Sequence, residues 1–144
     1  HLELDNVDHR QLVADFWQSP QPISPNVGVK ACDAVSAILD GRIKAIWIMA
    51  TNPVVSLPDA DNFRQALAEC DLVIVSDCSV DSDTVKCADI VLPAQGWGEK
   101  SGTVTNSERR ISRQRKLMPA PGLAKPDWWI LSQVAIPISP ILAT

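Results

Sequence analysis

The chain has 144 residues, of which 46% are hydrophobic, and 13 basic against 17 acidic side chains give it a net charge of -4. This length is enough to bury one ordinary hydrophobic core and too short to make two domains likely, so we expect a single domain spanning residues 1–144. The acidic balance argues against nucleic acid or an anionic membrane surface as the main partner and favours a small molecule or another protein.

The pattern of residues 8–29 predicts a surface helix followed by an extended connector. Apolar side chains recur at helical spacing between Asp8 and Trp17, and the Asp8 carboxylate can accept hydrogen bonds from the first turn. Three prolines in the stretch 18–29 fix the backbone and remove donors, which favours an extended path. A second helix is expected at 31–39, and Gly41 supplies the left-handed residue that ends it.

Three short apolar runs rich in β-branched residues predict strands at Ile43–Met49, Leu72–Val75 and Ile90–Leu92. Their apolar character is continuous rather than alternating, so we expect both faces to be buried. An amphipathic helix at 59–70 would link the first two strands into a parallel βαβ unit with a right-handed crossover. A short helix or irregular crossover at 81–88 leads to the third strand. The expected fold is therefore α/β, with three layers of helix, mainly parallel sheet and helix.

The last third of the sequence is less regular. Beyond Gln95 the chain is rich in glycine and polar residues, and it is strongly basic from Arg109 to Lys116. A final helix is expected at Asp127–Ala135. The tail 136–144 has no clear pattern and stays unassigned.

Polar residues follow the predicted strands at their carboxyl ends, where ligands bind in doubly wound sheets. Asn52 comes after the first strand and offers both a donor and an acceptor. Ser76 and Asp77 come after the second, and a carboxylate there suits a ribose diol or a guanine edge. Each also has a plain structural explanation, since Asn-Pro forms turns and an aspartate after a strand often caps a helix. The chain contains neither GxGxxG nor GxxxxGK[ST], so any nucleotide would bind in another way.

The segment 97–110 carries the densest polar chemistry in the chain. Lys100 could neutralise a phosphate, and two nearby glycines, Gly98 and Gly102, allow close backbone approach. Short hydrogen-bonding side chains follow at Thr103, Thr105 and Asn106. The alternative for this segment is a solvated hairpin with paired charges.

Neither the cysteines nor the histidines form a catalytic or metal-binding pattern. The four cysteines are Cys32, Cys70, Cys78 and Cys87. They contain no CxxC pair, so we expect them to be reduced, buried and free of metal. His1 and His9 both lie far along the chain from every strand end. We therefore expect no catalytic residue and no metal ligand in this chain.

The apolar runs and the N-terminal segment indicate where in the cell the protein is expected. No run approaches the roughly 18 apolar residues of a membrane span, and the polar, acidic segment 1–10 does not resemble a signal peptide. A cytoplasmic protein without a membrane partner is expected. The sequence begins at His1 rather than Met, which favours a piece of a longer protein.

Taken in order, four motifs resemble one family, the molybdopterin oxidoreductases that hold two molybdopterin guanine dinucleotides, and within it the assimilatory nitrate reductases. The motifs are IKAIWIMATNPVVSLPD, DLVIVSD, ADIVLPAQGWGEKSGTVTNSERRISRQR and PGLAKPDWW. The resemblance covers residues 5–135. It implies a Rossmann-like middle domain of a larger subunit, one of two related α/β domains that each hold the guanosine end of one pterin dinucleotide.

The resemblance also implies which residues contact that cofactor, molybdenum-bis(molybdopterin guanine dinucleotide). They are Asn52, Ser76, Asp77, Lys100 and Asp127, and only Asp127 has no independent argument, because its position otherwise predicts a helix N-cap. In the family, the molybdenum-ligating cysteine and the cysteines of a [4Fe-4S] cluster belong to earlier segments. The full-length protein would carry that cluster, and this piece would not.

The implied reaction is reduction of nitrate to nitrite by oxygen-atom transfer, with this piece inactive by itself. Its partners would be the cofactor, the remaining domains of the subunit and an electron-donor protein or domain. Two alternatives remain open. One is the corresponding domain of a formate dehydrogenase, and the other is a non-catalytic structural relative such as that in the large iron–sulfur subunit of respiratory complex I.

Overall fold

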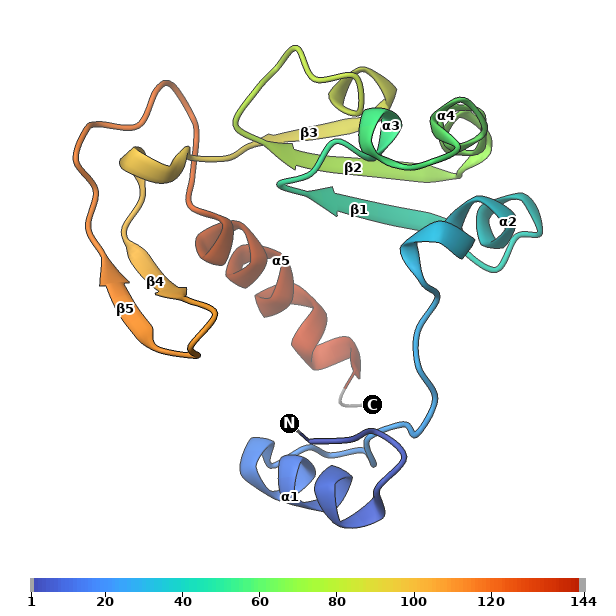
Figure 1. Ribbon diagram of the computed structural model, residues 1–144, viewed down its shortest axis with the longest axis vertical. Helices are drawn as coiled ribbons and strands as arrows, with labels where there is room; N and C mark the ends of the chain where they lie inside the picture. The colour runs from blue at the N-terminus through green and yellow to red at the C-terminus, as the bar shows by residue number, and fades with distance from the viewer. Residues whose placement is uncertain (1, 143–144) are drawn as a thin grey trace.

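The computed structural model describes residues 2–142 and contains a three-stranded parallel sheet, which lies in the upper part of Figure 1. The strands are β1 (Ala45–Met49), β2 (Leu72–Asp77) and β3 (Ile90–Pro93), in that order across the sheet. Ile46 pairs with Val73 in the parallel register of β1 and β2. The predicted α/β class is confirmed, as is the prediction that the three strands are adjacent and parallel.

Helices α2 (Ala34–Leu39), α3 (Pro53–Ser56) and α4 (Ala60–Glu69) lie on one side of the sheet (Figure 1). Gly41, with φ of 77°, ends the turn after α2 as predicted. The amphipathic spacing of α4 places Phe63, Ala66 and Leu67 on one stripe, and these side chains share a core with Val73 and Val75 of β2. The core consists of Ala34, Ile38, Ile48, Val54, Phe63, Ala66, Leu67, Val73, Val75 and Val85.

The opposite side of the sheet holds a single long helix, α5 (Asp127–Leu142) (Figure 1). Its Ile130 is buried, but Trp129 and Leu131 remain more than a third exposed. The second helical layer is therefore one incompletely packed helix. The helix starts at Asp127 as predicted but continues past Ala135, and of the unassigned tail only residues 143–144 lie outside the described part of the chain.

The prediction that all three strands are buried on both faces is wrong, most clearly for β3, none of whose residues is buried. Ile90 and Val91 of β3 are exposed. In β2, the residues facing the helices, Val73 and Val75, are buried, whereas Leu72 and Ile74 on the other face are only partly so. Burial thus follows the three helices that cover one face of the sheet.

Two further parts lie away from the sheet. Helix α1 (Val7–Trp17) stands apart at the end of the connector and buries none of its side chains (Figure 1). Its N-cap is Asn6 rather than the expected Asp8, because the Asn6 side chain accepts from the amides of residues 8 and 9. The strands β4 (Gly102–Thr105) and β5 (Ile111–Gln114) form an antiparallel hairpin.

Three short 3₁₀ turns complete the described elements: η1 (Ala31–Asp33), η2 (Val85–Cys87) and η3 (Trp97–Glu99). The crossover expected at 81–88 is thus largely irregular and ends in η2. No helix within residues 2–142 has the length and apolar character needed to cross a membrane.

The four cysteines are free thiols, but the prediction that they are buried is wrong. Cys32 lies in η1 and Cys78 in the loop after β2, and both are exposed. Cys70 and Cys87 are half-buried at the ends of α4 and η2. The spacing of apolar residues suggested core positions, but these thiols lie in a short turn, in a loop or at the end of an element, where solvent reaches them.

Candidate functional site

A pocket of about 290 Å³ opens at the carboxyl ends of the three parallel strands. Loops diverge there after β1, β2 and β3, and the start of α5 closes one side. The residues that line it are Ala50, Thr51, Asn52, Ser76, Asp77, Cys78, Ala94, Gln95, Gly96, Trp97, Lys100 and Asp127. All five residues singled out from the sequence line this one pocket.

Asn52 follows β1 and is the N-cap residue of α3, yet its side chain does not cap that helix. Its Oδ1 atom instead accepts two hydrogen bonds from Thr84, one from the amide nitrogen at 3.2 Å and one from the hydroxyl at 2.7 Å. The Thr84 hydroxyl in turn accepts from the Val54 amide at 3.3 Å. Asn52 is therefore anchored by a residue 32 positions away in the sequence.

Asp77 ends β2, and both of its carboxylate oxygens are already engaged by the following loop. Oδ1 accepts from the Ser79 amide at 3.0 Å, and Oδ2 accepts from the Ser82 hydroxyl at 3.1 Å. Such contacts match the structural role of an aspartate after a strand. A carboxylate oxygen has two lone pairs, so Asp77 can still accept from a ligand in the pocket.

Ser76 differs from the other four predicted residues because its side chain is wholly buried. Its hydroxyl accepts from the Trp47 indole nitrogen at 2.8 Å. The two residues lie on neighbouring strands, and the contact holds the Trp47 ring against the sheet. Ser76 borders the pocket but is wholly buried, so its hydroxyl serves the contact with Trp47.

Lys100 and Asp127 form an ion pair across the pocket, with 2.5 Å between Nζ and Oδ2. Their side chains are 23% and 27% exposed, so both also reach solvent. The pairing of β3 with the segment before α5 brings them together, since the Lys125 amide donates to the Pro93 carbonyl and the Gln95 amide donates to the Lys125 carbonyl, each at 3.0 Å. An ammonium has three donors and a carboxylate can accept several hydrogen bonds, so both groups can contact a ligand in addition to each other.

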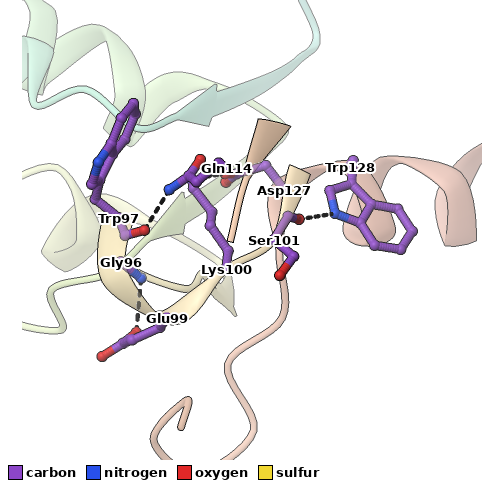
Figure 2. A network of polar contacts seen from close by, with 8 residues as sticks. All are labelled: Gly96, Trp97, Glu99, Lys100, Ser101, Gln114, Asp127 and Trp128. Atoms are coloured by element: carbon purple, nitrogen blue, oxygen red, sulfur yellow. Dashed lines mark hydrogen bonds and ion pairs between the residues drawn. The ribbon is translucent and has the colours of Figure 1, made fainter. Parts of the chain in front are cut away.

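The loop that carries Lys100 is held by a network of its own, shown in Figure 2. The Glu99 carboxylate accepts from the Gly96 amide at 2.8 Å, and the Trp128 indole donates to the Ser101 carbonyl at 3.0 Å. Gln114 on β5 donates through its side chain to the Trp97 carbonyl. These contacts keep the loop in place without using the ammonium of Lys100.

Trp97 lines the pocket, but it was not among the site residues predicted from the sequence. Trp97 is 69% exposed, and its ring projects away from Glu99 (Figure 2). A flat aromatic face beside polar groups suits a planar heterocycle. A signal was available, because a tryptophan between two glycines in a polar loop has few core residues to pack against.

Ala50 is a second unpredicted feature of the pocket. It has a φ of 53°, in the left-handed region that residues with a side chain seldom adopt, and it follows β1 directly. Its amide still donates to the Ser76 carbonyl at 3.0 Å. The bend turns the chain sharply away from the sheet, which opens the space between residues 50–52 and β2.

Other candidate groups do not reach the pocket. Thr103, Thr105 and Asn106 lie on the β4–β5 hairpin, where the Asn106 side chain accepts from the Arg110 amide at 2.9 Å and shapes the turn. Both explanations of segment 97–110 thus hold in part, since Lys100 lies at the pocket and the rest forms a solvated hairpin. Within residues 2–142, no cluster of three or more His, Cys, Asp or Glu side chains could hold a metal.

A family model for molybdopterin oxidoreductases matches residues 11–136. A nitrate reductase of Shewanella frigidimarina is 59% identical over 126 residues, which are 88% of this chain and 13% of that protein. The alpha subunit of a formate dehydrogenase of Methanocaldococcus jannaschii is 38% identical over 129 residues, or 89% of this chain and 18% of that protein. The chain thus spans less than a fifth of either relative.

One solved structure, an acetylene hydratase from Pelobacter acetylenicus, superposes with a TM-score of 0.65 at 20% identity. The superposition covers 94% of this chain and 19% of that one. At that identity the match concerns the fold alone. It agrees with the parallel sheet and the helices that flank it.

Proposed function

Because the chain belongs to the molybdopterin oxidoreductase family, which implies a molybdenum–molybdopterin cofactor, we propose that its pocket holds the guanosine end of a molybdopterin guanine dinucleotide. The observation that carries the proposal is that Asn52, Asp77, Lys100 and Asp127 converge on one cavity at the carboxyl edge of a parallel sheet. That edge is where nucleotides bind in open α/β folds.

The groups in the pocket fit a guanosine nucleotide in both polarity and shape. The guanine edge and the ribose hydroxyls carry hydrogen-bond donors, and the carboxylates of Asp77 and Asp127 can accept hydrogen bonds from them. Phosphate and carbonyl oxygens need donors, which the Lys100 ammonium and the Asn52 amide supply. A volume of about 290 Å³, open on one side, suits one end of a dinucleotide while the rest extends beyond this chain.

The complete subunit is proposed to be a nitrate reductase, on the basis of the 59% identity to the Shewanella protein. When bound, the molybdenum centre would supply the two-electron oxygen-atom transfer that reduces nitrate to nitrite. The residues of this chain hold and orient the nucleotide end. Other segments would carry the molybdenum ligand, a [4Fe-4S] cluster, the second guanosine-binding domain and the contact with an electron donor. A cytoplasmic location is part of the same proposal.

Lys100 and Asp127 provide the test, in the complete subunit. Lys100→Met and Asp127→Asn should lower the guanine nucleotide and molybdenum recovered per subunit after dialysis, because each removes a charge at the pocket. Asp40→Asn is the matched control, since Asp40 also pairs with a basic side chain but lies outside the pocket. Full nucleotide content in both pocket variants would contradict the proposal.

A second candidate function is that of a formate dehydrogenase, favoured by the 38% identity to the Methanocaldococcus subunit. Both enzymes would use the same nucleotide pocket, so the pocket residues do not separate them. Nitrate-dependent against formate-dependent electron transfer by the complete subunit decides between the two. Absence of molybdenum from the complete protein would instead favour a non-catalytic structural relative, such as the domain in the large iron–sulfur subunit of respiratory complex I.

A further inference from the structure

The Asn52–Thr84 contact determines which end of the Asn52 amide a ligand can meet. The Thr84 backbone N–H can only donate, so the Asn52 atom at 3.2 Å from it must be the amide oxygen. The Thr84 hydroxyl agrees, because it accepts from the Val54 amide and therefore directs its own proton to Asn52 at 2.7 Å. Three hydrogen bonds thus define one orientation of the amide.

Burial makes this orientation costly to reverse. Thr84 is wholly buried, and turning the Asn52 amide over would place its NH₂ group against the buried Thr84 N–H. Two donors would then face each other with no acceptor, and the Thr84 N–H would lose its partner. Within the described residues, the Asn52 amide nitrogen has no hydrogen-bond partner, and Asn52 lines the pocket.

Thr84 also takes over the task that Asn52 would ordinarily perform. An asparagine at an N-cap usually accepts from the second or third amide of its helix. Here the Thr84 hydroxyl accepts from the Val54 amide of α3, and the Asn52 side chain makes no capping bond. The Asn52 side chain therefore makes no capping contact, and the residue lines the pocket instead.

We infer that Thr84 is a positioning residue that makes Asn52 a dedicated hydrogen-bond donor, so that the pocket recognises an acceptor of the bound nucleotide at this point. The acceptor is an oxygen of a phosphate or carbonyl group or an unprotonated ring nitrogen. The inference rests on the proposed function, because it takes the pocket to be the nucleotide site. It extends that proposal by assigning a role to a buried residue that is not among those lining the pocket.

Asn52→Asp is the discriminating variant, because it keeps the oxygen that Thr84 holds and replaces only the amide nitrogen. The complete subunit, prepared free of cofactor, is titrated with GDP in a calorimeter. The Kd for GDP should rise about tenfold or more, since a donor is exchanged for a negative oxygen facing an acceptor. A Kd equal to or lower than that of the wild type would overturn the inference.

Thr84→Val and Thr84→Ser test the positioning role directly. The valine variant keeps the shape but loses the hydroxyl, and its Kd should rise about fivefold, whereas serine should restore GDP binding to near the wild-type value. In the Asn52→Asp background the valine change should have little further effect on Kd. If valine lowers the melting temperature and leaves Kd unchanged, Thr84 is structural only and the inference fails.

Asp127→Asn separates failure of this inference from failure of the proposed function. If Asp127→Asn and Lys100→Met weaken GDP binding but Asn52→Asp does not, the nucleotide site stands and the role of Thr84 is refuted. If none of the three changes the Kd, the pocket is not the nucleotide site and the inference falls with the proposed function.

Discussion

Asp77 gives the sharpest separation between a ligand contact and a loop contact. Its two carboxylate oxygens accept from Ser79 and Ser82 within the loop after β2, and the residue also lines the pocket. Hydrogen bonds to a charged group contribute about 1.5–3 kcal/mol each, and these belong near the low end, because the Ser79 contact is exposed and the Ser82 contact is only partly buried. Asp77→Ala should therefore lower the free energy of unfolding by about 2–4 kcal/mol, whatever the ligand does.

Asp77→Asn removes the charge while keeping most of the loop contacts. Its remaining oxygen can still accept from the Ser79 amide, and its NH₂ group can donate to the Ser82 hydroxyl. The free energy of unfolding should fall by less than about 1 kcal/mol. If the carboxylate accepts from the nucleotide, affinity should fall about tenfold to a hundredfold, which corresponds to about 1.5–3 kcal/mol.

Both quantities are measured on one preparation of the complete subunit. Urea unfolding gives the stability, and guanine nucleotide and molybdenum recovered per subunit after dialysis give the retention. A stable Asp77→Asn variant that retains both at the wild-type level would refute a ligand contact. Asp77 would then be a loop residue that happens to border the pocket.

Three further outcomes are expected in the 144-residue chain. Phe63→Ala should lower the free energy of unfolding by about 3–5 kcal/mol in urea titrations, because the ring is buried in the core, and a loss below about 1 kcal/mol would contradict that packing. The hydrogen bond from Arg42 lowers the pKa of Asp40, so this contact stabilises the fold above the ordinary pKa of aspartate and is lost as pH falls through the lowered value. Arg42→Gln should raise the pKa of Asp40 in a carboxyl NMR titration, and an unchanged titration would show that the pair does not form. A thiol reagent should label exposed Cys78 faster than half-buried Cys87, and equal rates would contradict the difference in exposure.

The sequence determined the elements of the sheet and the edge at which the site lies. Apolar runs such as Leu72–Val75 and the amphipathic helix before them are local patterns, and their order dictates a parallel right-handed crossover. Residues that directly follow parallel strands must then meet at one edge. Asn52 and Asp77 could be placed there from their positions alone.

Only the tertiary structure decided what each of those residues can offer a ligand. Ser76 is buried under the Trp47 indole, Asn52 turns its oxygen to Thr84, and Lys100 meets Asp127 because residues 93–95 pair with residue 125. These contacts join residues about 30 positions apart. Local patterns specify which face of an element is apolar, but the pairing of single donors and acceptors depends on the relative placement of distant segments. For the same reason the exposure of β3 and of the cysteines emerged only once the packing of the helices was known.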